Sequence, residues 1–371
     1  MKEKTIRQSN YELMRIVSMF FIVFWHVLLH TGAVNHSTGF LRYASLFLYL
    51  VLSVHTNSYM LVSGYFQYKK PIKTKKILSV VGIAWFYNLV LTLIGLFLLH
   101  YEFTNLQLAQ NTSPLNINGY WYITGYVLLM FFAPILNKFI ENTNQKEHKT
   151  ILIVFFILFS IIPFITRNSS INNDGRSILQ FIFLYLIGAY LGKYPIEESY
   201  HFKKNSKEKN RIIYISIFFS CMIIKFLVLQ FGSIFENIYG SIIHDFYDTI
   251  AFTKDSFSSP MTLIASICFF LYFGTLDFKS KWINKISSLT LGVYLFHENR
   301  VTAKYIYDNW ISSVTVNDTT VILLQLLVYA IIIFIISAFV EWIRQILAKL
   351  IFSSKSIKKI SSKLDNYIKN F

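Results

Sequence analysis

The sequence predicts an all-α polytopic membrane protein: a bundle of about ten transmembrane helices with both termini in the cytoplasm. Of the 371 residues, 54% are hydrophobic and only 15% are charged. That leaves too little polar sequence to cover the surface of a soluble protein of this size. The hydrophobic residues gather in long runs, and the basic residues gather in every second loop between those runs.

The apolar runs are long enough to cross a bilayer, since a span needs about 20 residues and fewer when it is buried inside a bundle. They lie near residues 12–31, 41–66, 77–99, 120–140, 150–166, 178–192, 211–230, 260–276, 286–307 and 320–347. The run at 178–192 is the weakest, and 231–259 is a candidate re-entrant segment. We expect one transmembrane domain over residues 1–348, followed by a basic cytoplasmic tail at residues 349–371.

The distribution of lysine and arginine orients these runs in the membrane. The N-terminus, every second loop and the C-terminal tail together hold most of the 35 basic residues. The intervening loops hold only Arg42, Arg167, Arg176, Lys254, Arg300 and Lys304. Cytoplasmic loops carry an excess of basic residues, and a miscounted span would reverse every later loop. The asymmetry therefore favours ten spans with both termini inside.

Three other interpretations of the composition are less favoured. The net charge of +16 does not indicate nucleic-acid binding, because the lysines lie in short loops between apolar runs. The basic N-terminus resembles a signal peptide, but Glu12 and Arg15 open the first run and no A-x-A-like cleavage site follows it. Cys221 and Cys268 lie within apolar runs, which favours two buried thiols over a disulfide.

The first run, YELMRIVSMFFIVFWHVLLH, places ionisable side chains at membrane depth, where they are costly unless they face a polar interior. Arg15 and His26 are eleven residues apart, which on a helix is about 20° from whole turns and roughly 16 Å along the axis. They therefore share one face. The alternative is that Arg15 reaches lipid phosphates and His26 is a hydrogen-bonded histidine of the bundle. Because both must pack inside a bundle, we expect a functional site.

Arg15, ten intervening residues and His26 resemble the R-x10-H signature of the membrane acyltransferase-3 family. These are bacterial integral-membrane enzymes that transfer acetyl and other acyl groups to glycans. SGYF at 63–66, GYWYI at 119–123 and LGVYLFH at 291–297 also resemble motifs of the family, in the same order along the chain. The resemblance covers the whole chain and suits ten spans. The sequence departs from the family after residue 297, where Glu298 begins a Glu-Asn-Arg segment and many relatives have a proline.

The resemblance implies acyl-CoA as a co-substrate, with no permanently bound cofactor. Acyl-CoA is made in the cytoplasm, so Arg15 and the loop residues Lys69, Lys70 and Lys73 are expected to bind the anionic nucleotide end of CoA. A guanidinium suits phosphate because it is always charged and can bind two oxygens. The pantetheine arm would then thread between helices towards His26.

His26 is expected to be catalytic, either as the general base on a sugar hydroxyl or as a carrier of the acyl group. His297 and Glu298 are expected near it in depth as further catalytic residues, with Glu298 orienting a histidine. Glu12 lies about 21 Å from His26 along the helix and is expected to pair with Arg15 instead.

The candidate substrate-binding residues are His30, Trp121 and Arg300, although Arg300 could instead neutralise Glu298. For His55, Asn57 and Ser58, in the second run, hydrogen bonds between helices are the favoured use.

The segment 231–259 mixes aromatic residues with His244, Asp245 and Asp248. Such a mixture would serve a sugar site, but an aromatic belt at the membrane interface explains the same residues more simply. The chain lacks a zinc-binding spacing such as H-E-x-x-H and a Walker-type phosphate loop. We therefore expect neither a metal site nor ATP-driven transport.

The predicted function is O-acyl transfer, with acetyl-CoA as the donor and a cell-surface or capsular polysaccharide, or its lipid-linked precursor, as the acceptor. The expected partners are acyl-CoA, the glycan and membrane lipid, and the expected location is the bacterial cytoplasmic membrane. The alternative is a glycan flippase or exporter in which the ionisable residues line a polar path. A polytopic glycosyltransferase or polymerase would need larger outer loops.

Overall fold

The computed structural model describes residues 7–35, 37–71, 74–113, 115, 119–166, 170–199, 202–239, 256–311 and 320–353. Every regular element in these ranges is a helix. The α-helices are α1 (Ser9–His30), α2 (Gly39–Leu52), α3 (His55–Gln67), α4 (Thr74–Phe97), α5 (Asn105–Thr112), α6 (Trp121–Asn142), α7 (Gln145–Phe156), α8 (Ile162–Thr166), α9 (Ile178–Lys193), α10 (Lys207–Tyr239), α12 (Pro260–Gly274), α13 (Lys281–Ser287), α14 (Thr290–His297), α15 (Arg300–Ala303) and α16 (Thr320–Ser353). Four short segments are 3-10 or π-helical: η1 (Ile157–Ile161), η2 (Asn173–Gly175), η3 (Ile196–Glu198) and η4 (Lys304–Ile311).

Seven helical segments in the described part of the chain are long and apolar enough to cross a membrane. They are α1, α2 with α3, α4, α6, α7 through α8, α10 and α16, and their positions match seven predicted runs. The shorter apolar helices α9 and α12 match two more. The protein is thus a multi-pass helical membrane protein.

The predicted run at 286–307 differs from the others, because it is not one helix. It is divided among the end of α13, α14, α15 and the start of η4, each too short to cross a bilayer alone. The count of ten spans is therefore not established by helix length. The cytoplasmic location of both termini stays a prediction, and α16 continues to Ser353, past the predicted domain boundary at 348.

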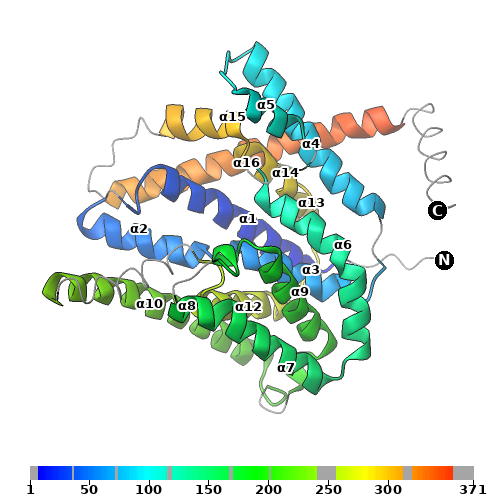
Figure 1. Ribbon diagram of the computed structural model, residues 1–371, viewed down its shortest axis with the longest axis vertical. Coiled ribbons are helices and arrows are strands. Elements are labelled where there is room, and N and C mark those ends of the chain that lie inside the picture. Colours follow the sequence, from blue (N-terminus) through cyan, green and yellow to red (C-terminus); the bar gives the residue numbers. More distant parts are fainter. Residues whose placement is uncertain are drawn as a thin grey trace.

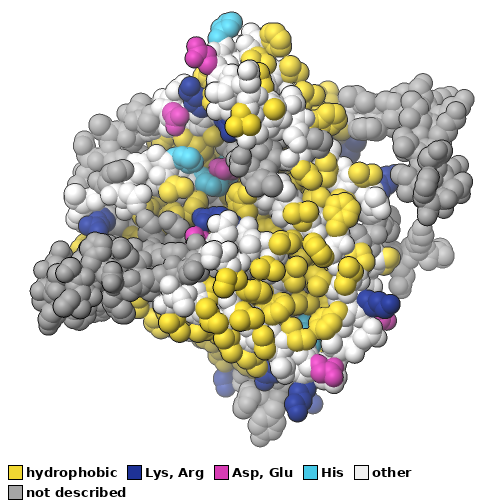
Figure 2. Space-filling view, viewed as in Figure 1, with side chains coloured by type: hydrophobic (Ala, Val, Ile, Leu, Met, Phe, Trp, Pro, Cys, Tyr) yellow, Lys and Arg dark blue, Asp and Glu magenta, His cyan; other side chains and the backbone are white. Residues whose placement is uncertain are grey.

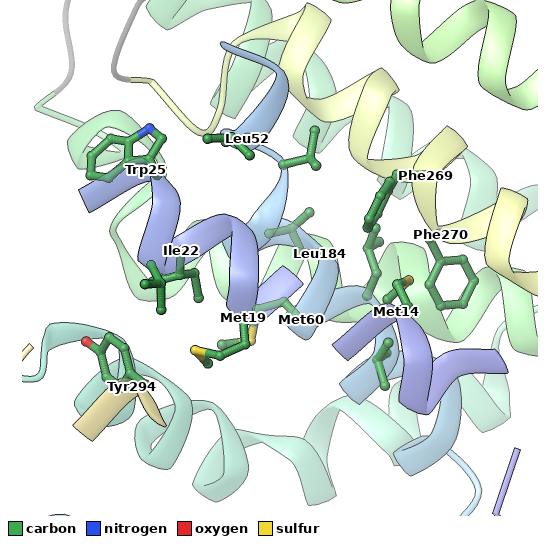
Figure 3. Packing of buried hydrophobic residues seen from close by; sticks show 14 of the residues in the cluster. Met14, Met19, Ile22, Trp25, Leu52, Met60, Leu184, Phe269, Phe270 and Tyr294 are labelled. Carbon is green, nitrogen blue, oxygen red and sulfur yellow. The ribbon is translucent and has the colours of Figure 1, made fainter. Parts of the chain in front are cut away.

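Helix α1 lies in the middle of the bundle (Figure 1). It contacts α2, α3 and α12 on one side and α13, α14 and α16 on the other. Its side chains Met14, Met19, Ile22 and Trp25 are buried and face residues of the surrounding helices (Figure 3). Because α1 has neighbours on most sides, a polar face on this helix must point into the protein.

Helices α3 and α9 pack at very short range. A Cβ atom added at Gly64 would collide with the carbonyl oxygen of Tyr185, and one added at Gly188 would collide with that of Leu61. Small residues that allow two backbones to approach are typical of helix contacts in membranes. This contact fixes α3, and with it His55 at the first position of α3.

The outward faces of the peripheral helices are apolar. On α16, Leu324, Ile335 and Phe339 are 63%, 60% and 55% exposed. Figure 2 shows a broad area of hydrophobic side chains on one face, with most of the charged side chains near its margins. An apolar surface of this extent is expected to face lipid.

A buried carboxylate on α16 holds the divided segment in place. Glu341 is 2% exposed and accepts hydrogen bonds from Tyr87 on α4 (2.8 Å) and from Arg344 (2.6 and 2.7 Å). Gln345 donates to Glu341 (2.9 Å) and also to the carbonyl of Ser288 (3.0 Å), in the turn between α13 and α14. Removing Arg344 would leave the Glu341 carboxylate buried without a counter-charge. The network ties the turn before α14 to α4 and α16.

Candidate active site

A cavity of about 1110 Å³ follows α1 through the bundle. Its lining begins with Arg7 and Tyr11 and continues to His26 and Leu29 near the other end of the helix. Typical small-molecule sites enclose roughly 300–1,000 Å³. The cavity is therefore large enough to hold two substrates that meet inside it.

One end of the cavity is strongly basic. Arg7, Arg15, Lys70 and Lys76 line this end, which we call the basic mouth, and Glu12 is the one carboxylate among its described lining residues. Glu12 lies 3.4 Å from Arg15 Nη1 and accepts a hydrogen bond of 2.5 Å from Ser287. The Arg15 side chain remains 36% exposed. The mouth therefore keeps an excess of positive charge that suits an anionic ligand.

Aromatic side chains line the cavity between the mouth and His26. Tyr59, Tyr122, Tyr126 and Tyr294 line this stretch together with Met19. The Tyr59 hydroxyl donates to the carbonyl of Arg15 (2.7 Å), which fixes the ring on the cavity wall. Such a lining suits a chain with few polar atoms better than a charged group.

His26 meets two other functional side chains at the far part of the cavity. Its Nδ1 lies 3.3 Å from His297 Nε2 and 3.0 Å from Glu298 Oε1. His297 Nδ1 donates to the carbonyl of Val293 (2.6 Å), so in a neutral ring its Nε2 is an acceptor. His26 Nδ1 can then donate to His297, which leaves His26 Nε2 free of hydrogen bonds with any described residue. We call these three residues the histidine cluster.

The contact between His26 and Glu298 is electrostatic rather than a good hydrogen bond. Glu298 Oε1 has no hydrogen-bond partner among the described residues although His26 Nδ1 is only 3.0 Å away. A short distance with a poor angle makes a weak hydrogen bond. The carboxylate still stabilises positive charge on the His26 ring, because both groups are largely removed from water.

The break between α14 and α15 places Glu298 at the cavity. Asn299 begins α15 by accepting a hydrogen bond from Val301 N (3.1 Å). Its amide also donates to Tyr120 Oη (3.1 Å) and Asn88 Oδ1 (3.3 Å), and Tyr120 donates to the carbonyl of Leu295 (2.5 Å). This polar network fixes the turn that carries His297 and Glu298.

The histidine cluster also has the composition of a metal site. The ligand atoms of His26, His297 and Glu298 all lie within 4.8 Å of one another. Two imidazoles and a carboxylate are ligands that Zn²⁺ accepts. The facing nitrogens of His26 and His297 are, however, within hydrogen-bond distance of each other, so the cluster holds together without an ion.

Of the three lysines predicted to bind CoA, only one is found to line the cavity. Lys70 lies at the basic mouth. Lys69 is exposed, lies 5.2 Å above the Tyr68 ring and does not line the cavity. Lys73 is outside the described residues. Lys76, which was not singled out for binding, does line the mouth.

Of the residues predicted to bind substrate, one lines the cavity and two do not. Trp121 lines the cavity, whereas the exposed His30 stacks on Tyr307 (4.2 Å between ring centres) outside its lining. Arg300 does not line the cavity either, and it makes no ion pair with Glu298, although both residues are described. Residues 240–255, with His244, Asp245 and Asp248, fall outside the described residues.

Of the three residues of the second predicted run, Asn57 makes the expected hydrogen bonds to other segments: it donates to the carbonyl of Phe257 (2.8 Å) and to Ser266 on α12 (3.2 Å). Ser58 instead donates to the carbonyl of Val54 (2.8 Å), one turn back at the start of its own helix. His55 instead lines the cavity. Arg176, Tyr120 and Asn299 were missed, because only contacts between distant parts of the sequence reveal them.

The family comparison agrees with this geometry. A family model described as an acyltransferase domain, Acyl_transf_3, matches residues 8–343. The chain belongs to the acyltransferase-3 family. The match runs from the start of α1 into α16 and includes the histidine cluster, so this membrane protein is a transferase of acyl groups. No curated protein and no solved structure matches the chain.

Proposed function

We propose that the protein is an O-acyltransferase that moves an acetyl group from acetyl-CoA to a hydroxyl of a cell-surface or capsular polysaccharide, or of its lipid-linked precursor. The observation that supports this most is the continuity of the cavity. Its lining includes both the basic mouth and His26. A transferase that takes its donor from one side and its acceptor from the other needs such a passage.

In this proposal, the basic mouth binds the nucleotide end of CoA from the cytoplasm. The phosphates of CoA would meet Arg7, Arg15, Lys70 and Lys76, and guanidinium groups suit phosphate because they bind two oxygens at once. The pantetheine arm would extend along the aromatic stretch. Arg15 and His26 are roughly 16 Å apart along α1, a distance that an extended arm can span.

His26 would act as the general base through Nε2. The acceptor hydroxyl gives its proton to Nε2, its oxygen attacks the thioester carbonyl carbon, and the C–S bond then breaks. The proton passes from the imidazolium to the sulfur of CoA, so atoms and charge balance. Glu298 would stabilise the imidazolium while His297 keeps Nδ1 in position. The competing route, an acyl group carried on Nε2, would appear as a labile acetyl adduct on His26, trapped by rapid quenching after incubation with acetyl-CoA alone.

A gene-deletion strain tests this function. NMR spectra of its surface glycans are expected to lack one O-acetyl signal, which expression of the wild-type protein restores. His26→Asn is expected to reach normal abundance without restoring the signal, since a missing general base costs about 10²–10⁴-fold in rate. His100→Asn is the matched control, because His100 is exposed at the end of α4 and outside the cavity lining.

Two results would contradict the proposal. One is full glycan acetylation by His26→Asn. The other is a purified protein that is thermally stabilised by a lipid-linked sugar but does not turn over acetyl-CoA, which would favour the flippase or exporter.

A further inference from the structure

A second group of residues with a different character lines the same cavity beside the histidine cluster. Trp25, His55, Trp121, Arg176 and Phe257 line this part, which we call the Arg176 chamber. Three aromatic rings lie together there, with 6.3 Å between the centres of Trp121 and Phe257 and 6.2 Å between those of Trp25 and Phe257. Flat aromatic faces of this kind can stack against the apolar face of a sugar ring.

Two polar side chains in the chamber have hydrogen-bonding capacity left over. His55 is 4% exposed, and its Nδ1 is 2.8 Å from Thr56 Oγ1. Its Nε2 is buried and has no partner among the described residues. When Thr56 donates to Nδ1, Nε2 carries the ring proton and becomes a donor. A buried donor without a partner is unfavourable, and a bound ligand would remove that cost.

Arg176 supplies the positive charge of the chamber. Its guanidinium carbon lies 5.1 Å from the centre of the Phe257 ring. Among the described residues its nearest carboxylate, Asp174, is 3.9 Å away through one oxygen, at the limit of an ion pair. Arg344, by comparison, binds Glu341 through two hydrogen bonds of 2.6 and 2.7 Å. Arg176 therefore keeps donors available for an incoming anion.

We infer that the acceptor carries an anionic oxygen group, a carboxylate or a phosphate, which Arg176 binds while a sugar ring stacks within the Arg176 chamber. Arginine suits both anions because its planar fork matches two oxygens at once. The chamber adjoins the histidine cluster, so a hydroxyl on the same sugar would face His26. This inference rests on the proposed acyl transfer and narrows its acceptor to acidic sugars or sugar phosphates.

Three soluble sugars with the same ring test the inference on the full-length purified protein. Methyl glucoside is neutral, methyl glucuronide carries a carboxylate, and glucose 1-phosphate carries a phosphate. Binding is measured by thermal stabilisation, and transfer is measured from acetyl-CoA. We expect at least one charged sugar to bind about tenfold more tightly than the neutral one, and the better of the two identifies the anion.

Variants of Arg176 separate recognition from folding. Arg176→Gln is expected to weaken binding of the charged sugar about tenfold or more and to leave the neutral sugar unchanged. Arg176→Lys keeps the charge and should lose less. Arg42→Gln is the matched control, because Arg42 is an exposed arginine on α2 outside the cavity lining.

The outcomes distinguish this inference from the proposed function. Equal binding of charged and neutral sugars by the wild type, equal weakening of all three by Arg176→Gln, or no binding of any of them would overturn the inference. Acetyl transfer to all three sugars at similar rates would leave the proposed function intact. Charged sugars that bind through Arg176 without receiving an acetyl group would contradict the proposed function and support the site.

Discussion

At the residue scale, His26 has two ring nitrogens with different surroundings. Nδ1 faces His297 and Glu298, at 3.3 and 3.0 Å, and Nε2 has no hydrogen bond with a described residue. One nitrogen thus anchors the ring and the other is available for chemistry. This division of roles requires the α14–α15 turn to stay in place, since both partners of Nδ1 lie there.

Removal of metal ions tests whether the histidine cluster acts as a hydrogen-bonded array. We expect treatment with EDTA or 1,10-phenanthroline to leave acetyl transfer unchanged within about twofold. The reason is that His26 and His297 already hydrogen-bond each other at their candidate ligand nitrogens. Elemental analysis of the purified protein provides the second measurement. Stoichiometric metal, together with activity that is lost on chelation and restored by Zn²⁺, would instead identify the three side chains as ligands.

The sequence predicted individual residues where the reason was local. Arg15 and His26 share a helix, so their spacing alone gives their common face. The i, i+3 pairing of Glu12 with Arg15 is confirmed at 3.4 Å for the same reason. Arg176 could not be found in this way, because its place in the cavity depends on the contact between its loop and Phe257.

At the element scale, the turn between α14 and α15 depends on hydrogen bonds with Asn88 on α4 and with Tyr120, just before α6. We expect Tyr120→Phe to lower the free energy of unfolding by about 1–3 kcal/mol, because Asn299 and the Leu295 carbonyl each lose a buried partner. The turnover number should fall while the KM for acetyl-CoA stays unchanged. Thermal denaturation and steady-state kinetics measure both, with Tyr43→Phe, at an exposed position, as the control. An unaltered turnover number in Tyr120→Phe would show that the turn does not need this network.

The contact between α3 and α9 gives a prediction about packing. Gly64→Leu is expected to destabilise the protein by about 1–3 kcal/mol or more, because its Cβ would collide with the Tyr185 backbone. Gly82→Leu on α4 should be tolerated, since no atom beyond its chain neighbours and the backbone of its own helix lies within 4 Å of a Cβ built there. Protein abundance in membranes and the unfolding temperature provide the measurement. Similar behaviour of the two variants would refute the close contact.

The helices that hydropathy alone determines could be predicted from the sequence. Long apolar runs must become helices in lipid, because each backbone group has to be satisfied within its own segment. The run at 286–307 begins apolar but carries Glu298, Asn299 and Arg300 near its middle, and Asn299 and the Glu341 network hold it in short helices. The polar Glu-Asn-Arg segment was a local sign of this break, whereas the contact of Gln345 with Ser288, 57 residues away, left no local pattern.

At the scale of the whole molecule, the two ends of the cavity should face opposite sides of the membrane. In a chain with both native cysteines replaced, we expect Lys281→Cys, near the basic mouth, to react with a membrane-impermeant maleimide only after the cells are permeabilised. Ile171→Cys, in the loop that precedes Arg176, should react in intact cells. The reason is the excess of basic residues that cytoplasmic loops carry. The opposite labelling pattern would show that the protein has the opposite orientation in the membrane, and that acyl transfer runs in the opposite direction.

The length of α16 has a consequence for the lipid that surrounds the protein. Its candidate span, Ile322–Leu350, has 29 residues and measures about 43 Å, against a hydrocarbon core of about 30 Å. A helix longer than the core is accommodated by tilting, by thickening the bilayer around it, or by extending its charged end, with Arg344 and Lys349, into the headgroup region. Glu341 and Gln345 tie the same helix to the turn before α14. A change in membrane thickness should therefore change the tilt of α16 and displace the segment that carries His297 and Glu298. We expect the rate of acyl transfer to depend on the acyl-chain length of the host lipids.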